Sequence, residues 1–400
     1  MILSKKTLST ILARSSALGI NFLLVVFTAR VWGSEGRGLI ALIMADVAII
    51  VILNNIFAGA TVAYHTPRHG GRRLFAAAWG GALLTSLAGA LIFSLIQGFQ
   101  YFFLLAGIAL LNSLATSISF YWLGKNNIRL YNLMMVLPPV LLILFLLTGY
   151  YVAGITRLRV YFISWFLAYG TVWVLGLLTL RRADIRREKK EQSLLKSMTS
   201  YGTKSELSYF LQFLNYRLAY FLISLWLGLE ELGLFSVAVA VSEAVWIIGK
   251  SISALLYADV LNTSVHRERI RLTVKAIRTS FLLTVPALAL LVLIPDHIYL
   301  FIFGHDFSGI RPLVLYLTPG ILAVAVANVI GHYFSAIGKM NVLIIKSLSG
   351  LTVNALLLAF LLKDHGLPAA CLALDIAYLT IFIYLGSLFI KEWRKNKTTA

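Results

Sequence analysis

The sequence has few of the residues on which metal and acid–base chemistry depend. Its 400 residues include one cysteine, seven histidines and 16 acidic residues. The single cysteine, Cys371, excludes an intrachain disulfide and a cysteine-based metal cluster. The histidines have no ligand-like spacing, so we expect no metal and no cofactor. Because carboxylates are also scarce, an integral-membrane enzyme is disfavoured.

Apolar residues are abundant instead. They make up 60% of the chain, and the mean hydropathy of +0.86 lies outside the soluble range. Runs of about 20 apolar residues, long enough to cross a hydrocarbon core, recur along the sequence without the period-2 alternation of a membrane barrel. We predict twelve membrane helices, at residues 9–29, 39–61, 74–96, 101–123, 133–153, 160–180, 207–227, 234–256, 277–295, 313–335, 342–362 and 369–390.

The net charge of +19 has an uneven distribution along the chain. If the N-terminus is cytoplasmic and the segments alternate, cytoplasmic connections carry 25 of the 35 basic residues and the opposite side carries six. This asymmetry follows the positive-inside rule, so it predicts a multi-pass membrane protein with both termini in the cytoplasm. Membrane lipids are expected partners, and nucleic acid is not.

An internal repeat connects the two halves of the chain. Residues Trp32–Leu39 recur loosely as Leu227–Leu234, at a constant offset of about 195 residues. The matching pairs are Gly33/Gly228, Glu35/Glu230, Gly38/Gly233, Leu39/Leu234 and Ala45/Ala240. Each copy joins two long apolar segments, which indicates one unit written twice. A duplicated helical bundle of this kind encloses a cleft between its halves.

The charged stretch 181–206 is the strongest boundary in the sequence. It predicts an N-terminal six-helix lobe at 1–180, a basic cytoplasmic linker at 181–206 and a C-terminal six-helix lobe at 207–400. An even number of spans gives both lobes the same orientation, which makes the repeat parallel. The expected fold is therefore an all-α integral membrane protein, with twelve transmembrane helices in two lobes around a central cavity.

Charged residues inside the apolar runs are the first candidates for a site, because each costs about 2.5–3.5 kcal/mol at mid-bilayer unless it meets water or a partner. They are Arg14, Asp46, Arg217, Glu243, Lys250, Lys346 and Asp375. The slightly cationic set suits a lipid diphosphate, whose oxygens accept charge-assisted hydrogen bonds. Arg217 lies deep in its span and is the leading ligand. Helical spacing adds other polar residues on the same faces, so the predicted substrate ligands are Arg217, Arg14, Lys250, Lys346, Asn21, Tyr220 and Asn354.

Other roles for these residues remain open. Arg14 can reach the cytoplasmic headgroups, and Lys250 and Lys346 can serve as interfacial anchors. Asp46 and Glu243 are candidates for ion coupling, but they can equally neutralise neighbouring bases. Asp375 can pair with Lys346, and the polar stripes can simply join helices.

Several short motifs occur in a characteristic order. They are Asn215–Leu218, Phe235–Ala238, Ser242–Trp246, Phe303–Phe307, Leu317–Gly320 and Tyr333–Lys339. Together they resemble the polysaccharide (O-antigen, Wzx-like) flippases of the multidrug/oligosaccharidyl-lipid/polysaccharide (MOP) exporter superfamily. The resemblance implies alternating access that moves undecaprenyl-diphosphate-linked oligosaccharide from the cytoplasmic to the periplasmic leaflet. The acid that often follows the Tyr-Arg pair in this family is absent, because Leu218 and Ala219 stand there.

The resemblance also implies a polysaccharide polymerase and glycosyltransferases as functional partners. A drug or metabolite exporter of the same superfamily is the alternative, although its usual cationic cargo fits a basic interior poorly. A membrane-embedded glycan polymerase or ligase would need a large outward loop. The longest predicted outward connection, Asp296–Pro312, is too short for one.

Overall fold

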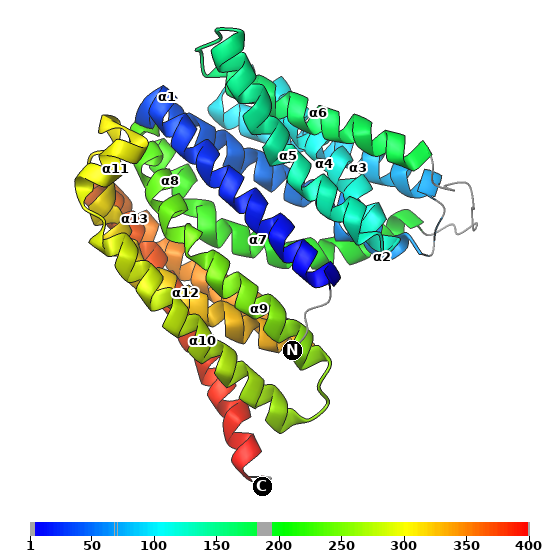
Figure 1. The fold of residues 1–400 in the computed structure, drawn as a ribbon, viewed down its shortest axis with the longest axis vertical. Helices are drawn as coiled ribbons and strands as arrows, with labels where there is room; N and C mark the ends of the chain where they lie inside the picture. Colours follow the sequence, from blue (N-terminus) through cyan, green and yellow to red (C-terminus); the bar gives the residue numbers. More distant parts are fainter. Residues whose placement is uncertain (1–4, 68, 70, 182–193, 399–400) are drawn as a thin grey trace. The chain divides into compact units, whose positions relative to one another are not determined.

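The protein is seen in a computed structural model that describes residues 5–67, 69, 71–181 and 194–398. Every regular element in this part of the chain is helical (Figure 1). The α-helices are α1 (Lys5–Ala58), α2 (Ala60–His65), α3 (Gly71–Gln97), α4 (Phe102–Gly124), α5 (Ile128–Leu147), α6 (Arg159–Arg181), α7 (Leu194–Trp226), α8 (Leu229–Ala244), α9 (Trp246–Leu261), α10 (His266–Leu293), α11 (Asp296–Phe303), α12 (Ile310–Ala336) and α13 (Met340–Thr398).

The twelve predicted membrane segments lie mainly in helices, although some cross a helix break or run a residue or two past a helix end. The predicted all-α membrane fold is confirmed. Eight described segments are long and apolar enough to span a bilayer, or nine with the bent pair α8–α9. Two of the eight, α1 and α13, each contain two helices joined at a non-helical glycine, Gly33 or Gly366. Both glycines have positive φ, a conformation that L-residues with a Cβ adopt only with strain.

Two predicted boundaries differ from the structure. Helix α7 begins at Leu194 rather than at 207, so residues 194–206 of the predicted linker belong to this helix. Residues 182–193 of that linker lie outside the described part. The predicted span 234–256 is a pair of helices, α8 and α9, bent by 44° around Val245. Neither proline nor glycine lies at the bend, and composition therefore gave no sign of it.

The chain forms two compact units. Unit 1 comprises Met1–Leu24 and Ile43–Phe210, and unit 2 comprises Val25–Leu42 and Leu211–Ala400. Unit 2 thus includes the segment around Gly33 together with the C-terminal helices. Helix α7 contributes its first half to unit 1 and its second half to unit 2. The central cavity stays a prediction.

The core of unit 1 joins helices α2 to α6 to the start of α7. Aromatic and aliphatic side chains from α2, α3, α4, α5, α6 and α7 are buried together there, including Tyr121 and Met198. Elsewhere in unit 1, the buried Asn54 of α1 joins its own helix to α3 and α4. Its Nδ2 donates to Ser86 Oγ at 2.8 Å and to Ser113 Oγ at 2.7 Å, and Thr85 donates to its Oδ1.

Asn54→Leu is expected to lower the stability of the protein by about 1–2 kcal/mol, because it leaves buried hydroxyls without their shared partner. Thermal unfolding of the purified protein in detergent measures this change. Gln100→Leu, at an exposed position, is the matched control and should unfold with the wild type. Equal stability of the two variants would show that the network contributes nothing.

Unit 2 has its main core among α9, α10, α12 and α13, which lie together in Figure 1. Tyr333 and Phe334 of α12 are fully buried against Phe389 of α13 and Ile270 of α10. The single cysteine, Cys371, is buried in the same unit beside the carbonyl of Leu313. Its packing environment agrees with a structural thiol.

The two copies of the sequence repeat touch each other inside unit 2. A Cβ on Gly38 would lie 1.8 Å from the carbonyl oxygen of Leu229, and a Cβ on Gly233 would lie 1.9 Å from that of Ser34. Ser34 and Leu229 occupy equivalent positions of the repeat, as do Gly38 and Gly233, so the contact is reciprocal. Backbone lies directly on backbone at both places, and only glycine fits.

Candidate functional site

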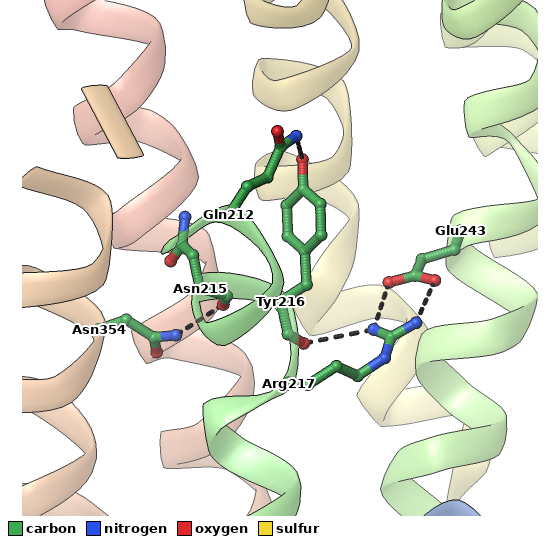
Figure 2. Close-up of polar contacts among 6 residues, drawn as sticks. All are labelled: Gln212, Asn215, Tyr216, Arg217, Glu243 and Asn354. Carbon is green, nitrogen blue, oxygen red and sulfur yellow. Dashed lines mark hydrogen bonds and ion pairs between the residues drawn. The ribbon is translucent and has the colours of Figure 1, made fainter. Parts of the chain in front are cut away.

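A charged pair in unit 2 is the centre of the candidate site. Arg217 on α7 donates two parallel hydrogen bonds to Glu243 at the end of α8, with N–O distances of 2.7 and 2.8 Å (Figure 2). A third bond, of 3.2 Å, runs from Arg217 to the carbonyl of Tyr216. The two side chains are 25% and 17% exposed, so the pair is sheltered without being sealed.

Aromatic rings surround this pair. The Arg217 guanidinium lies 5.0 Å from the centre of the Tyr220 ring, a distance typical of a cation–π contact. Tyr216, Trp246 and Tyr378 form a triangle with ring centres 5.0–6.1 Å apart. Glu243 at the end of α8 and Trp246 at the start of α9 lie three residues apart, on either side of the bend. One short segment therefore supplies both the carboxylate and the indole.

Amide side chains extend the site along α7 and α13. Gln212 donates to the Tyr216 hydroxyl at 2.7 Å, and Asn354 donates to the carbonyl of Asn215 at 2.9 Å (Figure 2). Among the described residues, the buried Oδ1 atoms of Asn215 and Asn354 have no hydrogen-bond partner. Nor does Nε1 of Trp246. Buried polar atoms without a partner are uncommon in folded proteins, and each one needs an explanation.

The structure brings some of the predicted ligands together. Arg217 and Tyr220 are in contact, and Asn354 reaches the same turn of α7 through Asn215. Lys250 is exposed, one turn beyond Trp246, and its ammonium lies 5.4 Å from the Trp246 ring. These four residues belong to one neighbourhood of unit 2.

Three other predicted ligands lie apart from this neighbourhood or outside the description. Lys346 is buried on α13 and lies beside Gly331 of α12. Asn21 is exposed and belongs to unit 1. The side chain of Arg14 lies outside the described residues. The structure therefore gives no contact that joins these three to Arg217.

The predicted acidic residues have three different environments. Glu243 neutralises Arg217, which was one of its two expected roles. Asp375 accepts a hydrogen bond of 3.1 Å from the backbone N–H of Gly320, so the described contacts of this carboxylate are with α12 rather than with Lys346. Asp46 is fully buried in unit 1.

Sequence reasoning missed two contributors. The predicted spans place Arg37 in the connection between segments 9–29 and 39–61, but it is buried in unit 2 and close enough to Tyr220 to interact with it electrostatically. Only the repeat, which places Arg37 in the turn that packs on α8, hinted at this position. The triangle of aromatic rings was also missed, because its members come from three separate helices.

The chemistry of the site suits an anion attached to a polar chain. A guanidinium offers parallel donors to a phosphate as readily as to a carboxylate. Aromatic faces and amides are the groups that contact sugar rings and hydroxyls. Among the described residues, no group of three or more His, Cys, Asp or Glu side chains could hold a metal ion.

Comparison with known proteins identifies the family. The family profile described as "Polysaccharide biosynthesis protein" matches residues 103–312, more than half of the chain. The chain belongs to this family. Among curated protein sequences, none is significantly similar to this member of the family.

Several solved transporter structures have a similar fold. An inward-facing multidrug resistance MATE family transporter of the MOP superfamily is similar with a TM-score of 0.72, 16% identity and 96% of each chain covered. The lipid II flippase MurJ, in an inward closed conformation, gives 0.64 at 16% identity, over 98% of this chain and 89% of that chain. The MATE multidrug transporter DinF-BH gives 0.68 at 18%, over 96% and 94%. This family member thus has the MOP fold, and the resemblance seen in the sequence is confirmed.

Proposed function

We propose that the protein is a flippase that moves undecaprenyl-diphosphate-linked oligosaccharide from the cytoplasmic to the periplasmic leaflet of a bacterial inner membrane. Both termini are cytoplasmic in this proposal. The family assignment and the MOP fold support translocation of a glycan on a lipid. The observation that carries the proposal is the Arg217–Glu243 pair among aromatic and amide groups. Glycosyltransferases would supply the cargo, and a polymerase would consume it.

In the proposed cycle, Glu243 holds the Arg217 guanidinium in place while the site is empty. The diphosphate then takes the place of the carboxylate, because both present two oxygens to the same pair of N–H donors. Tyr220 supports the guanidinium from its ring face during this exchange. Lys250 and Lys346 add positive charge to the C-terminal unit, and Arg14 and Asn21 add polar groups to the N-terminal one. Alternating access then carries the headgroup across.

The glycan moiety has its own set of groups. The Tyr216, Trp246 and Tyr378 rings provide apolar faces for sugar rings, and Asn215 and Asn354 provide unpaired acceptors for hydroxyls. The site does not favour a cationic drug, since its central carboxylate, Glu243, is already paired with the Arg217 guanidinium. A multidrug exporter with this fold would more naturally present an unpaired acid there.

Arg217→Ala is expected to reduce glycan translocation by about 10–100-fold, which corresponds to the loss of charge-assisted hydrogen bonds worth about 1.5–3 kcal/mol. The measurement is the accumulation of lipid-linked oligosaccharide on the inner leaflet of a deletion strain that expresses each variant at equal level. Arg217→Lys keeps the charge but loses the parallel donors, so it should fall between the two.

The matched control is Arg157→Ala, an exposed arginine in the connection before α6, which should translocate like the wild type. A wild-type rate in Arg217→Ala would remove its assigned role. If the wild type itself restores no translocation but exports a cationic dye, the protein is a drug exporter and the proposal is wrong.

A further inference from the structure

Helix α10 carries basic side chains along one face of its N-terminal part. The members of this basic stripe, all exposed, are Arg267, Arg271, Lys275 and Arg278. Their spacings of four, four and three residues place them within about a quarter of the helix circumference. The remaining base of this part, Arg269, falls on the opposite side of the helix, where its guanidinium donates to the carbonyl of Thr263.

The same face of α10 continues as an apolar one. After Arg278, the helical spacing leads to exposed apolar residues, namely Leu282, Val285, Ala289 and Leu293. Helix α10 is also the least buried of the eight described segments that are long and apolar enough to span a bilayer. The exposed apolar residues therefore face acyl chains, and the basic stripe lies where that lipid-facing surface ends.

Nearby acids do not neutralise the basic stripe. Residues 266–278 include five basic residues and one acid, Glu268. This acid pairs with Arg271 at 3.6 Å, but the two side chains are 44% and 81% exposed. An ion pair so exposed contributes little, and most of the guanidinium surface stays accessible. The carboxylate of Glu392, on the neighbouring end of α13, is bonded to Lys339 at 2.9 Å.

The end of α13 extends this surface and marks its depth. The ring of His266 lies 3.4 Å from the carbonyl oxygen of Glu392, so the last turns of α13 lie beside the first turn of α10 (Figure 1). Lys391 and Trp393 are exposed there. Tryptophan in such a position is typical of the headgroup layer of a bilayer. The basic stripe therefore begins at headgroup depth.

Membrane topology alone does not explain the stripe. The positive-inside rule depends on how many bases a connection carries, and not on their rotation about a helix axis. A nucleic acid or an acidic protein would need the bases but not the apolar residues in line with them. A face that is basic and then apolar along one line matches a molecule with an anionic head and apolar tails.

We propose that this face of α10 is a binding site for an anionic phospholipid of the surrounding bilayer. The basic stripe donates charge-assisted hydrogen bonds to the phosphate oxygens, and the acyl chains lie along Leu282 and Val285. Lys391 adds attraction for a neighbouring headgroup. This lipid is a component of the membrane and not the cargo, so the site does not depend on the function proposed for Arg217.

The test uses purified full-length protein in detergent, without any glycan lipid. Thermal unfolding is followed while phosphatidylglycerol, or phosphatidylcholine with the same acyl chains, is added, and a third series uses inorganic phosphate. We expect saturable stabilisation by phosphatidylglycerol at concentrations at least about tenfold below those of phosphatidylcholine, because only the former carries a net charge. Inorganic phosphate should give no saturable stabilisation over the same range, since it lacks acyl chains.

The double variant Arg271→Gln with Lys275→Gln should raise the half-saturating concentration of phosphatidylglycerol by about 10–30-fold, because each base near an anionic headgroup contributes about 1 kcal/mol. Its response to phosphatidylcholine should not change. The matched control is Arg157→Gln with Arg159→Gln, which removes the same charge from two exposed positions near the start of α6. This control should bind phosphatidylglycerol like the wild type.

Three results would each overturn the site: equal stabilisation by the two phospholipids, an equal effect of inorganic phosphate, or unchanged phosphatidylglycerol binding in the double glutamine variant. If that variant does not fold, Arg278→Gln alone should weaken binding by about fivefold. Added NaCl should also weaken phosphatidylglycerol binding to the wild type, since salt screens exposed charges. Failure of these tests leaves the Arg217 translocation assay unaffected, so the two proposals can be judged separately.

Discussion

Gly38→Ala and Gly233→Ala are each expected to destabilise the protein by at least about 3 kcal/mol, the upper end of the usual cost of overpacking. In most helices the change from glycine to alanine stabilises by up to about 1 kcal/mol, because it lowers the entropy of the unfolded chain. Here the added methyl group meets a backbone carbonyl oxygen at 1.8 or 1.9 Å. A backbone cannot rotate away as a side chain can, so two helices must separate.

Thermal unfolding in detergent and the yield of monodisperse protein measure this effect. Gly80→Ala is the matched control, since nothing lies within 4 Å of a Cβ at this position of α3. We expect Gly80→Ala to be as stable as the wild type or slightly more stable. If Gly38→Ala behaved in the same way, the reciprocal backbone contact would not exist in the folded protein.

Glu243→Gln is expected to raise the affinity for undecaprenyl diphosphate by about 10–100-fold and to slow translocation. The carboxylate competes with the diphosphate for the same donors of Arg217, and a neutral amide competes less well. Release is slowed for the same reason, because no carboxylate is present to displace the cargo. Opposite effects on binding and on turnover therefore distinguish a competitor from a purely structural partner.

Binding of undecaprenyl diphosphate to protein in nanodiscs, measured beside the translocation rate, checks this expectation. The matched control is Glu392→Gln, which alters another ion pair of unit 2, that of Lys339 and Glu392 at 2.9 Å. Binding should not change in this control. If Glu243→Gln and Arg217→Ala weakened binding alike, the pair would act as a single structural unit and the exchange mechanism would be wrong.

The helices could be predicted because bilayer thickness sets their length and excludes other backbone structures. The turns at Gly33 and Gly228 could also be read from the sequence, since the two glycines recur at the offset of the repeat. In the structure both glycines have positive φ. The position of Arg217 and Glu243 inside long apolar runs likewise singled them out as charged residues that need a partner.

The pairing itself was not predictable, because Arg217 and Glu243 lie 26 residues apart on different helices. Which of several buried bases meets which acid depends on helix rotation, and hydropathy does not encode rotation. The bend at Val245 has no proline or glycine to announce it. Arg37 was misplaced for a similar reason: its number puts it in a connection, while the packing of the turn puts it inside unit 2.

The reciprocal fit of the two repeat turns also bears on the descent of this chain. After a gene duplication, each copy is ordinarily free to drift while the other keeps the ancestral role. Here the glycine of each copy packs against the backbone of the other copy. A bulkier residue at either glycine would therefore clash with the other copy even if that copy had not changed. The contact between the two repeat turns thereby limits how far the two halves can diverge in sequence at these positions.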